Sequence, residues 1–162
     1  MSRSIIVGVL LLSLALVIAG CSGSGDTTPT GPIRATLIVP QVTDGVVAIP
    51  ESEVESNRNV RFKVETPDGN MNFMAYVLNG EIYVRANVCP PCQSIGFSLD
   101  ENVLVCDRCA TKFRAQTGEG ISGACVDYPK ASVTYEISGG DIVMNSTALI
   151  TAYQDTLEPG WP

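Results

Sequence analysis

Two closely spaced cysteine pairs constrain the fold of this 162-residue chain more than any other feature. They read "CPPC" at 89–92 and "CDRC" at 106–109, and 13 residues separate them. Two residues between cysteines allow one tight turn to direct both sulfurs toward a common ion. The intervening "QSIGFSLDENVLV" is about the length of a hairpin that returns the second turn beside the first. The spacing therefore predicts that Cys89, Cys92, Cys106 and Cys109 converge on one metal centre, either zinc or iron–sulfur.

Three other interpretations use the same cysteines. Two disulfides could link a small β domain, but a Cys-x-x-Cys disulfide closes a tiny loop, stabilises little, and leaves Cys125 as an odd fifth thiol. A thioredoxin-like dithiol needs its first cysteine at the N-terminus of a helix, and "QSIGFSL" does not continue at a helical period. A structural zinc ribbon would use all four thiolates and stays open.

The N-terminus has the pattern of an exported, lipid-anchored protein. Arg3 precedes an apolar run over 5–19, which is shorter than the ~20 residues that a membrane-spanning helix needs. The ending "VIAGC" resembles the bacterial lipobox, in which the cysteine is diacylated and becomes the new N-terminus. We therefore expect a signal peptide at 1–20, a lipid on Cys21 and a flexible tether at 21–33. These features place the protein at the cell membrane, on its extracytoplasmic face.

The charge of the chain excludes one class of partner. Loss of residues 1–20 removes Arg3 and leaves nine Lys+Arg against 17 Asp+Glu, a net charge of −8. Such acidity argues against binding to nucleic acid. The remainder, 34–162, is long enough for one domain with one modest core.

The pattern of this domain is that of an all-β protein. Short runs rich in Val, Ile, Tyr and Phe are separated by Gly, Asn, Asp or Pro, and they predict strands at 34–40, 45–50, 59–65, 71–78, 81–88, 102–106, 131–137 and 141–145. Asn79-Gly80 and Gly139-Gly140 predict two hairpins. Only "STALITAYQDTL", at 146–157, suggests a helix, with Thr147 or Ser146 as its cap. We expect a small sandwich or barrel that carries the cysteines on loops between strands.

The absence of histidine excludes several kinds of site. No Ser-His-Asp or Cys-His catalytic arrangement, blue-copper site or Cys-x-x-Cys-His haem attachment can form. A metal must therefore bind through thiolates, with at most a carboxylate in addition. We expect no enzyme activity of the hydrolytic or transferase kind.

The cysteine segment has two electrostatic features of its own. Residues 85–130 hold five cations and five acids, so the −8 lies entirely outside them. The cations either offset a thiolate centre or form a solvated rim. Pro90 and Pro91 carry no N–H, so the first turn offers its sulfurs fewer backbone hydrogen bonds than the second. This difference predicts that the two halves of the site are electronically unequal.

The segment "VRFKVE…GEIYVRANVCPPCQSIGFSLDENVLVCDRCATKFRAQTGEGISGACVDYP" resembles the FtrD-like membrane iron–sulfur family over roughly Val60 to Ile150. Members accompany bacterial iron permeases and carry two Cys-x-x-Cys pairs followed by a glycine-rich "G-x-C-x-x-x-P". The resemblance includes Cys125, in "GACVDYP", which departs from the "GGCNPIP"-like text of the permease-linked members.

The arrangement also resembles a Rieske-type domain, in which two loops carry paired ligands and a third, proline-containing loop covers the cluster. Cysteines stand here where Rieske proteins have histidines, which implies a much lower reduction potential. Together the resemblances imply a Rieske-like β domain with an iron–sulfur cluster, or alternatively zinc or mononuclear iron, on Cys89, Cys92, Cys106 and Cys109. They imply Cys125 as an auxiliary ligand, and an electron-transfer role beside an iron permease or another redox partner. The alternative function is a redox-silent binding or structural lipoprotein.

Overall fold

The computed structural model describes residues 31–67 and 69–160. The predicted signal peptide, Cys21 and most of the tether lie outside the described residues. The strands are β1 (Thr36–Leu37), β2 (Gln41–Thr43), β3 (Val46–Pro50), β4 (Asn59–Thr66), β5 (Gly69–Leu78), β6 (Glu81–Ala86), β7 (Phe97–Asp100), β8 (Val103–Cys106), β9 (Lys112–Arg114), β10 (Gly120–Ser122), β11 (Glu136–Ser138) and β12 (Asp141–Asn145). The helices are α1 (Glu51–Asn57) and α2 (Ser146–Leu157).

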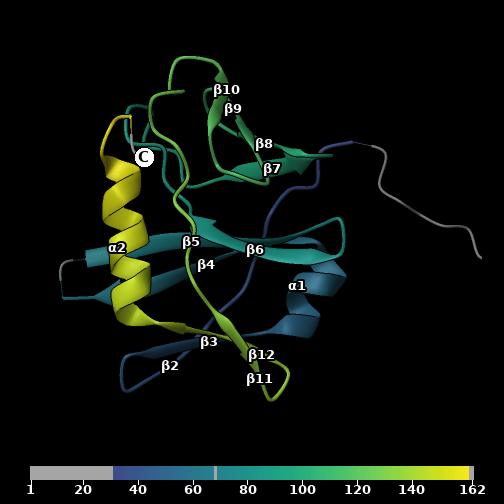
Figure 1. The fold of residues 1–162 in the computed structure, drawn as a ribbon, viewed down its shortest axis with the longest axis vertical. Helices are drawn as coiled ribbons and strands as arrows, with labels where there is room; N and C mark the ends of the chain where they lie inside the picture. The colour runs from purple at the N-terminus through teal and green to yellow at the C-terminus, as the bar shows by residue number, and fades with distance from the viewer. Residues whose placement is uncertain (1–30, 68, 161–162) are drawn as a thin grey trace, which may run out of the picture.

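The strands form three four-stranded sheets, and the predicted all-β class is confirmed. The central sheet has the order β1-β4-β5-β6, with β1 parallel to β4 and the other pairs antiparallel. The predicted hairpin at Asn79-Gly80 joins β5 to β6, and both turn residues have positive φ, 54° and 81°. Figure 1 shows this sheet between the other two, with β7 to β10 at one end and β2, β3, β11 and β12 at the other.

Strand β5 is buried on both faces because a second core lies behind it. Phe73 and Ala75 face a core built with the sheet β11-β12-β3-β2 and both helices. Met74 and Tyr76, in the alternate positions, face a smaller core that contains Cys89, Cys106 and Cys125. The two-residue period of a strand thus divides β5 between the body of the domain and the cysteine-bearing unit.

The helices differ in part from the prediction. Helix α2 is confirmed over 146–157, but its cap is Asn145, whose Oδ1 accepts a 2.7 Å hydrogen bond from the Thr147 N–H. Helix α1 was not expected, and the prediction of a single helix was wrong. This seven-residue helix buries only Val54, so it has no periodic apolar face from which it could be recognised. Neither helix in the described part of the chain is long and apolar enough to cross a membrane.

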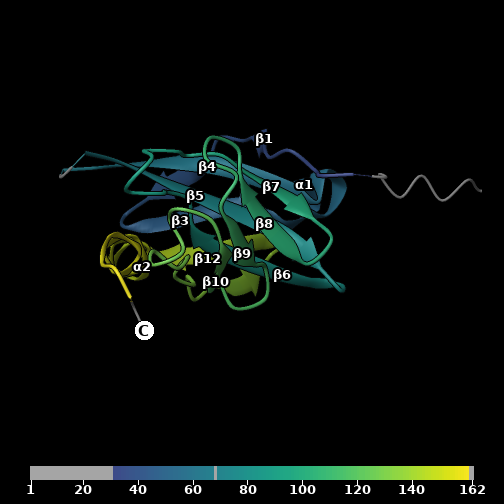
Figure 2. The ribbon, with the colours of Figure 1, turned by 90° about the horizontal axis from the view of Figure 1, so that it is seen from above.

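The third sheet, β10-β9-β8-β7, carries the cysteine turns. Strands β7 and β8 form the predicted hairpin between the two pairs, with Phe97 opposite Cys106. Seen from above, this sheet lies across the central strands, with α2 to one side (Figure 2). The chain enters the domain at the same hairpin, because Ile33 and Leu99 exchange two backbone hydrogen bonds of 2.7 and 2.9 Å.

Candidate metal centre

The two Cys-x-x-Cys turns have the same local structure. The Cys89 N–H donates to the Ser94 carbonyl, and the Cys106 N–H donates to the Thr111 carbonyl, each over 2.9 Å. In both turns the accepting residue lies five positions after the first cysteine. The second turn has a further 2.9 Å hydrogen bond, from the Ala110 N–H to the Cys106 carbonyl.

The residue after the second cysteine of each turn also has the same conformation. Gln93 and Ala110 both have a φ of 56°, in the left-handed region. Neither position is a glycine, so the sequence alone gave little sign of this reversal. The two turns, one before and one after the β7–β8 hairpin, thus share a conformation at this position.

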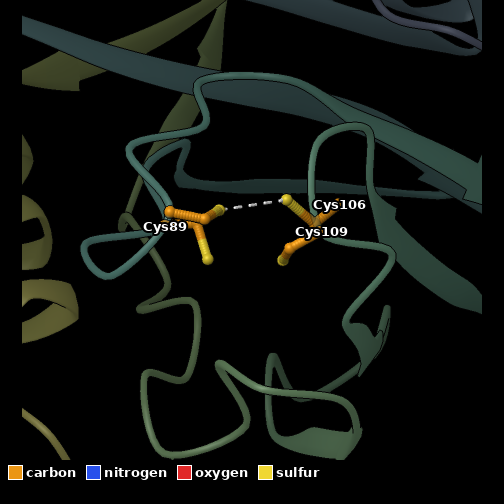
Figure 3. Close-up of side chains that lie close together, drawn as sticks. Cys89, Cys106 and Cys109 are labelled. Carbon is orange, nitrogen blue, oxygen red and sulfur yellow. Dashed lines mark hydrogen bonds between the residues drawn. The ribbon is translucent and has the colours of Figure 1, made fainter.

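The four cysteines of the turns meet, as their spacing predicts. The Sγ atoms of Cys89, Cys92, Cys106 and Cys109 all lie within 4.8 Å of one another. Between the turns, Cys92 Sγ is 3.7 Å from Cys106 Sγ. Figure 3 shows Cys89 on one loop facing Cys106 and Cys109 on the other. Cys89 and Cys106 are buried, whereas Cys92 and Cys109 are partly exposed, so the group of sulfurs has an inner side and an outer edge.

Cys125 brings a fifth sulfur to this group. Its Sγ lies 3.7 Å from Cys109 Sγ, and the residue is buried. Thr111 links the two: its Oγ1 accepts a 3.2 Å hydrogen bond from the Cys125 N–H and lies 3.2 Å from Cys109 Sγ. Gly123 allows this close approach, because a Cβ there would lie 2.7 Å from Thr111 Cα and its φ is 117°. None of the five cysteines at 89–125 is in a disulfide.

The surroundings divide the thiols into two kinds. Burial raises the pKa of Cys89 and of Cys106 above the usual range. Burial also acts on Cys109, but hydrogen bonds with the Thr111 hydroxyl and backbone, Cys106 and Cys92 outweigh it and lower its pKa to about 6. Because a metal binds thiolates, Cys89 and Cys106 must lose their protons on binding, whereas Cys109 reaches its thiolate form more readily than these two.

The two turns differ in the backbone hydrogen bonds that they offer to their first cysteine, as their sequences predict. At Cys106, backbone hydrogen bonds from Cys109 and Arg108 oppose the effect of burial. The position that matches Arg108 in the first turn is Pro91, which has no N–H. Cys89 therefore lacks one of the donors that Cys106 has.

Two cations of the cysteine segment are buried, and their burial was not predicted. Lys130 is 0% exposed and Arg85 is 3% exposed, whereas Arg108, Lys112 and Arg114 are exposed. The cations of the cysteine segment are thus partly a solvated rim and partly internal. The zero net charge of residues 85–130 was the available signal, but it could not say which cations are buried.

The donor set fits a thiolate-bound iron or zinc centre. Bonds of about 2.3 Å from one ion to four sulfurs give a tetrahedron with edges of about 3.8 Å. The 3.7 Å separation of Cys92 and Cys106 matches such an edge, and the other separations stay within 4.8 Å. Cysteine thiolates are also the usual ligands of iron–sulfur clusters.

Three solved structures are similar to the chain. A chain in a complex of reduced oxygenase and oxidized ferredoxin in carbazole 1,9a-dioxygenase superposes with a TM-score of 0.52 at 16% identity, covering 64% of this chain and 95% of that one. A ferredoxin of Sphingomonas yanoikuyae B1 gives 0.42 at 20% identity, over 46% and 74%. The plasma membrane Rieske protein PetC3 of the cyanobacterium Synechocystis gives 0.45 at 16% identity, over 59% and 94%. At 16% identity the first of these likenesses shows a shared fold alone.

No curated protein matches the chain. A family model does match: that of the membrane iron–sulfur containing protein FtrD-like, over residues 41–155. The match covers most of the chain and includes all five clustered cysteines. It confirms the resemblance drawn from the sequence, and with it an iron–sulfur centre as the cofactor that the four converging thiols could bind. The chain belongs to the FtrD-like family of membrane iron–sulfur containing proteins.

Proposed function

We propose that the protein is a membrane-anchored electron carrier whose iron–sulfur centre is held by Cys89, Cys92, Cys106 and Cys109, with Cys125 as an auxiliary thiol. The observation that carries this proposal is the meeting of four sulfurs from two separate turns within 4.8 Å of one another. Cys92 and Cys109 form the partly exposed edge of this group. An electron could therefore pass to or from a partner at this edge without entry of a substrate into the domain.

The chain's own residues would hold the centre and separate it from water on one side. Cys89 and Cys106 lie in an apolar core beside Phe97 and Phe113. The loop that carries Cys125 adds a further buried side chain next to Cys109. Because the centre would supply the electron chemistry itself, these residues bind it and set its surroundings, and they do not catalyse bond chemistry.

The proposed location is the extracytoplasmic face of the cell membrane. We expect removal of a signal peptide at 1–20 and attachment of a lipid to Cys21. The tether at 21–33 would then connect the domain, 34–162, to the membrane. The pairing of Ile33 with Leu99 supports this arrangement, because the chain enters the domain beside the cysteine hairpin. The redox edge would then lie near the end of the tether, within reach of a membrane partner such as an iron permease or a respiratory protein.

The test is elemental analysis and spectroscopy on the full chain, purified in detergent without oxygen. We expect iron together with acid-labile sulfide, and a visible absorption that bleaches on addition of dithionite. Radiolabelled fatty acid should be incorporated into the wild-type chain but not into Cys21→Ser. Colourless protein without iron would overturn the electron-carrier proposal, whereas an unlabelled wild type would overturn only the anchor.

A second function is favoured by one specific observation. The 3.7 Å separation of Cys92 and Cys106 is the spacing expected around a single ion, so the same thiolates suit zinc or mononuclear iron. With zinc the protein would be a redox-silent binding or structural lipoprotein. One zinc ion per chain, no sulfide and no colour would identify this function in the same experiment.

A further inference from the structure

Lys130 is a buried cation without an acidic partner. Its side chain is 0% exposed, and its Nζ donates a 2.8 Å hydrogen bond to the Val88 carbonyl. Its Nζ also lies 4.5 Å from the centroid of the Phe113 ring and 5.4 Å from that of Phe97. In the described residues the ion pairs are Lys63–Glu65 and Arg114–Glu119, both at the surface. No carboxylate in this part of the chain therefore neutralises Lys130.

Arg85 is buried in the same way and holds Lys130 in place. Its Nε donates to Tyr76 Oη over 2.8 Å, and its two terminal nitrogens donate to the carbonyls of Lys130 and Gln116 over 2.8 and 2.6 Å. All three acceptors are neutral. Gly118 allows this contact, because a Cβ there would meet both the Lys130 carbonyl and the Arg85 guanidinium.

Burying two positive charges is costly unless an opposite charge lies nearby. Burial lowers the pKa of Lys130 to about 8, and attraction to nearby cysteines opposes this effect. The Val88 carbonyl that accepts from Lys130 belongs to the residue before Cys89. Phe97 and Phe113, the rings beside the ammonium, lie in the same apolar core as Cys89 and Cys106. The groups that can carry negative charge next to the ammonium are thus the sulfurs of the candidate metal centre.

Four thiolates carry more negative charge than one divalent or trivalent ion can neutralise, so the loaded centre is a net anion. This anion would be the opposite charge that offsets the burial of Lys130. We propose that Lys130 is the internal counter-cation of this centre and that Arg85 positions it through the Lys130 carbonyl. The inference rests on the proposed function, because it requires thiolate ligation of a metal at Cys89, Cys92, Cys106 and Cys109.

Two consequences separate this role from ordinary packing. Lys130 stabilises the protein only when the thiolates are charged, so its contribution depends on bound metal. It also stabilises the more negative, reduced form of an iron centre over the oxidised form, and so raises the reduction potential.

The test compares Lys130→Met with Lys112→Met in the full chain. Lys112 is exposed on β9, in the sheet that carries the cysteine turns, so its charge is screened by solvent. Competition between a chelator and the reduced apoprotein for added Zn²⁺ measures the affinity whichever metal is native. We expect Lys130→Met to bind Zn²⁺ at least ~10-fold more weakly than the wild type, as outer-sphere changes do. Lys112→Met should match the wild type, and Lys130→Arg, which keeps the charge, should recover much of the loss.

The melting temperature with and without Zn²⁺ gives the second readout. Lys130→Met should be at least as stable as the wild type without metal, because it removes a buried charge, and less stable with metal. A variant that is equally weakened in both states, or unfolded already without metal, would show a packing role and overturn the inference. Zn²⁺ binding by the wild type but equally tight binding by Lys130→Met would overturn the inference alone. No Zn²⁺ or iron binding by the wild type would overturn the proposed function.

Discussion

Cys92 Sγ and Cys106 Sγ lie 3.7 Å apart, although the two residues belong to different turns separated by the β7–β8 hairpin. This contact closes the group of four sulfurs, because each turn already brings its own two cysteines together. Cys125, by contrast, reaches the group from a third loop and lies 3.7 Å from Cys109 Sγ. The two kinds of contact predict different roles for the four paired cysteines and the fifth.

Replacement of Cys106 by serine should abolish stoichiometric metal binding, because one of four ligands is lost from a closed donor set. Replacement of Cys125 by serine should leave one centre per chain but weaken its retention against a chelator by ~10-fold, the effect of an outer-sphere change. Metal analysis of the purified variants measures both. If Cys125→Ser lost metal as completely as Cys106→Ser, Cys125 would be a ligand and not an auxiliary thiol.

A change at Pro91 should raise the reduction potential of an iron centre. Pro91→Ala introduces an N–H where the second turn has that of Arg108, one of the backbone donors to Cys106. A hydrogen bond to the Cys89 sulfur would stabilise the reduced, more negative state. Pro91 is exposed, so the substitution should not disturb the core. Electrochemical titration of the anaerobic protein measures the shift.

Pro90→Ala is the matched control for this change. Its counterpart in the second turn is Asp107, whose N–H donates to the Gly96 carbonyl over 3.0 Å and not to a sulfur. We expect Pro90→Ala to leave the potential where it is in the wild type. Equal potentials for Pro91→Ala and the wild type would reject the idea that the two turns differ electronically.

Local sequence patterns predicted the elements that depend on neighbouring residues. Asn79-Gly80 and Gly139-Gly140 give the two hairpins because both turns need positive φ at both positions. The cysteine spacing gives the convergence of the two turns, since a short hairpin can only return the chain beside its start. Helix α2 has 12 residues, enough for the helical spacing of its buried residues, among them Leu149 and Ala152, to be recognised in the sequence.

What could not be predicted depends on contacts between distant segments. Lys130 is buried because Phe97 of β7 and Phe113 of β9 lie beside its ammonium. Nothing in its local sequence distinguishes it from the exposed Lys112. The cap of α2 is Asn145 and not Thr147 or Ser146, because the helical conformation already begins at Ser146. Such a one-residue shift is within the ordinary uncertainty of helix ends.

Gly123, in the loop that carries Cys125, should be costly to replace. In Gly123→Ala the new Cβ would lie 2.7 Å from Thr111 Cα, at a φ of 117° that other residues rarely adopt. We expect a loss of at least about 2 kcal/mol in the free energy of unfolding, because strain and overpacking act together. Gly139→Ala, with positive φ but open space around its Cβ, should lose only about 1 kcal/mol. Urea unfolding of the two variants measures the difference, and equal losses would show that the Thr111 contact is relieved at no cost.

Tyr76 should make stability depend on alkaline pH. Burial raises its pKa to about 12, against a smaller lowering by Arg85. An unfolded tyrosine ionises near pH 10, so between about pH 10 and 12 the unfolded state releases its proton while the folded state keeps it. The contribution of the neutral hydroxyl is therefore complete below pH 10 and is lost as pH rises through 12. A shift of this size corresponds to a stabilisation of about 3 kcal/mol.

Tyr76→Phe isolates this effect. Near pH 8 the variant should be less stable than the wild type by about 1–3 kcal/mol, because the hydroxyl donates to the Ala115 carbonyl and accepts from Arg85 Nε. Above pH 10 the wild type alone loses the contribution of this group, so the two free energies of unfolding should converge. Tyr135 and Tyr153 titrate in both proteins and cancel in the comparison. A difference that stays constant from pH 8 to 12 would mean that Tyr76 ionises in the folded protein as easily as in the unfolded chain.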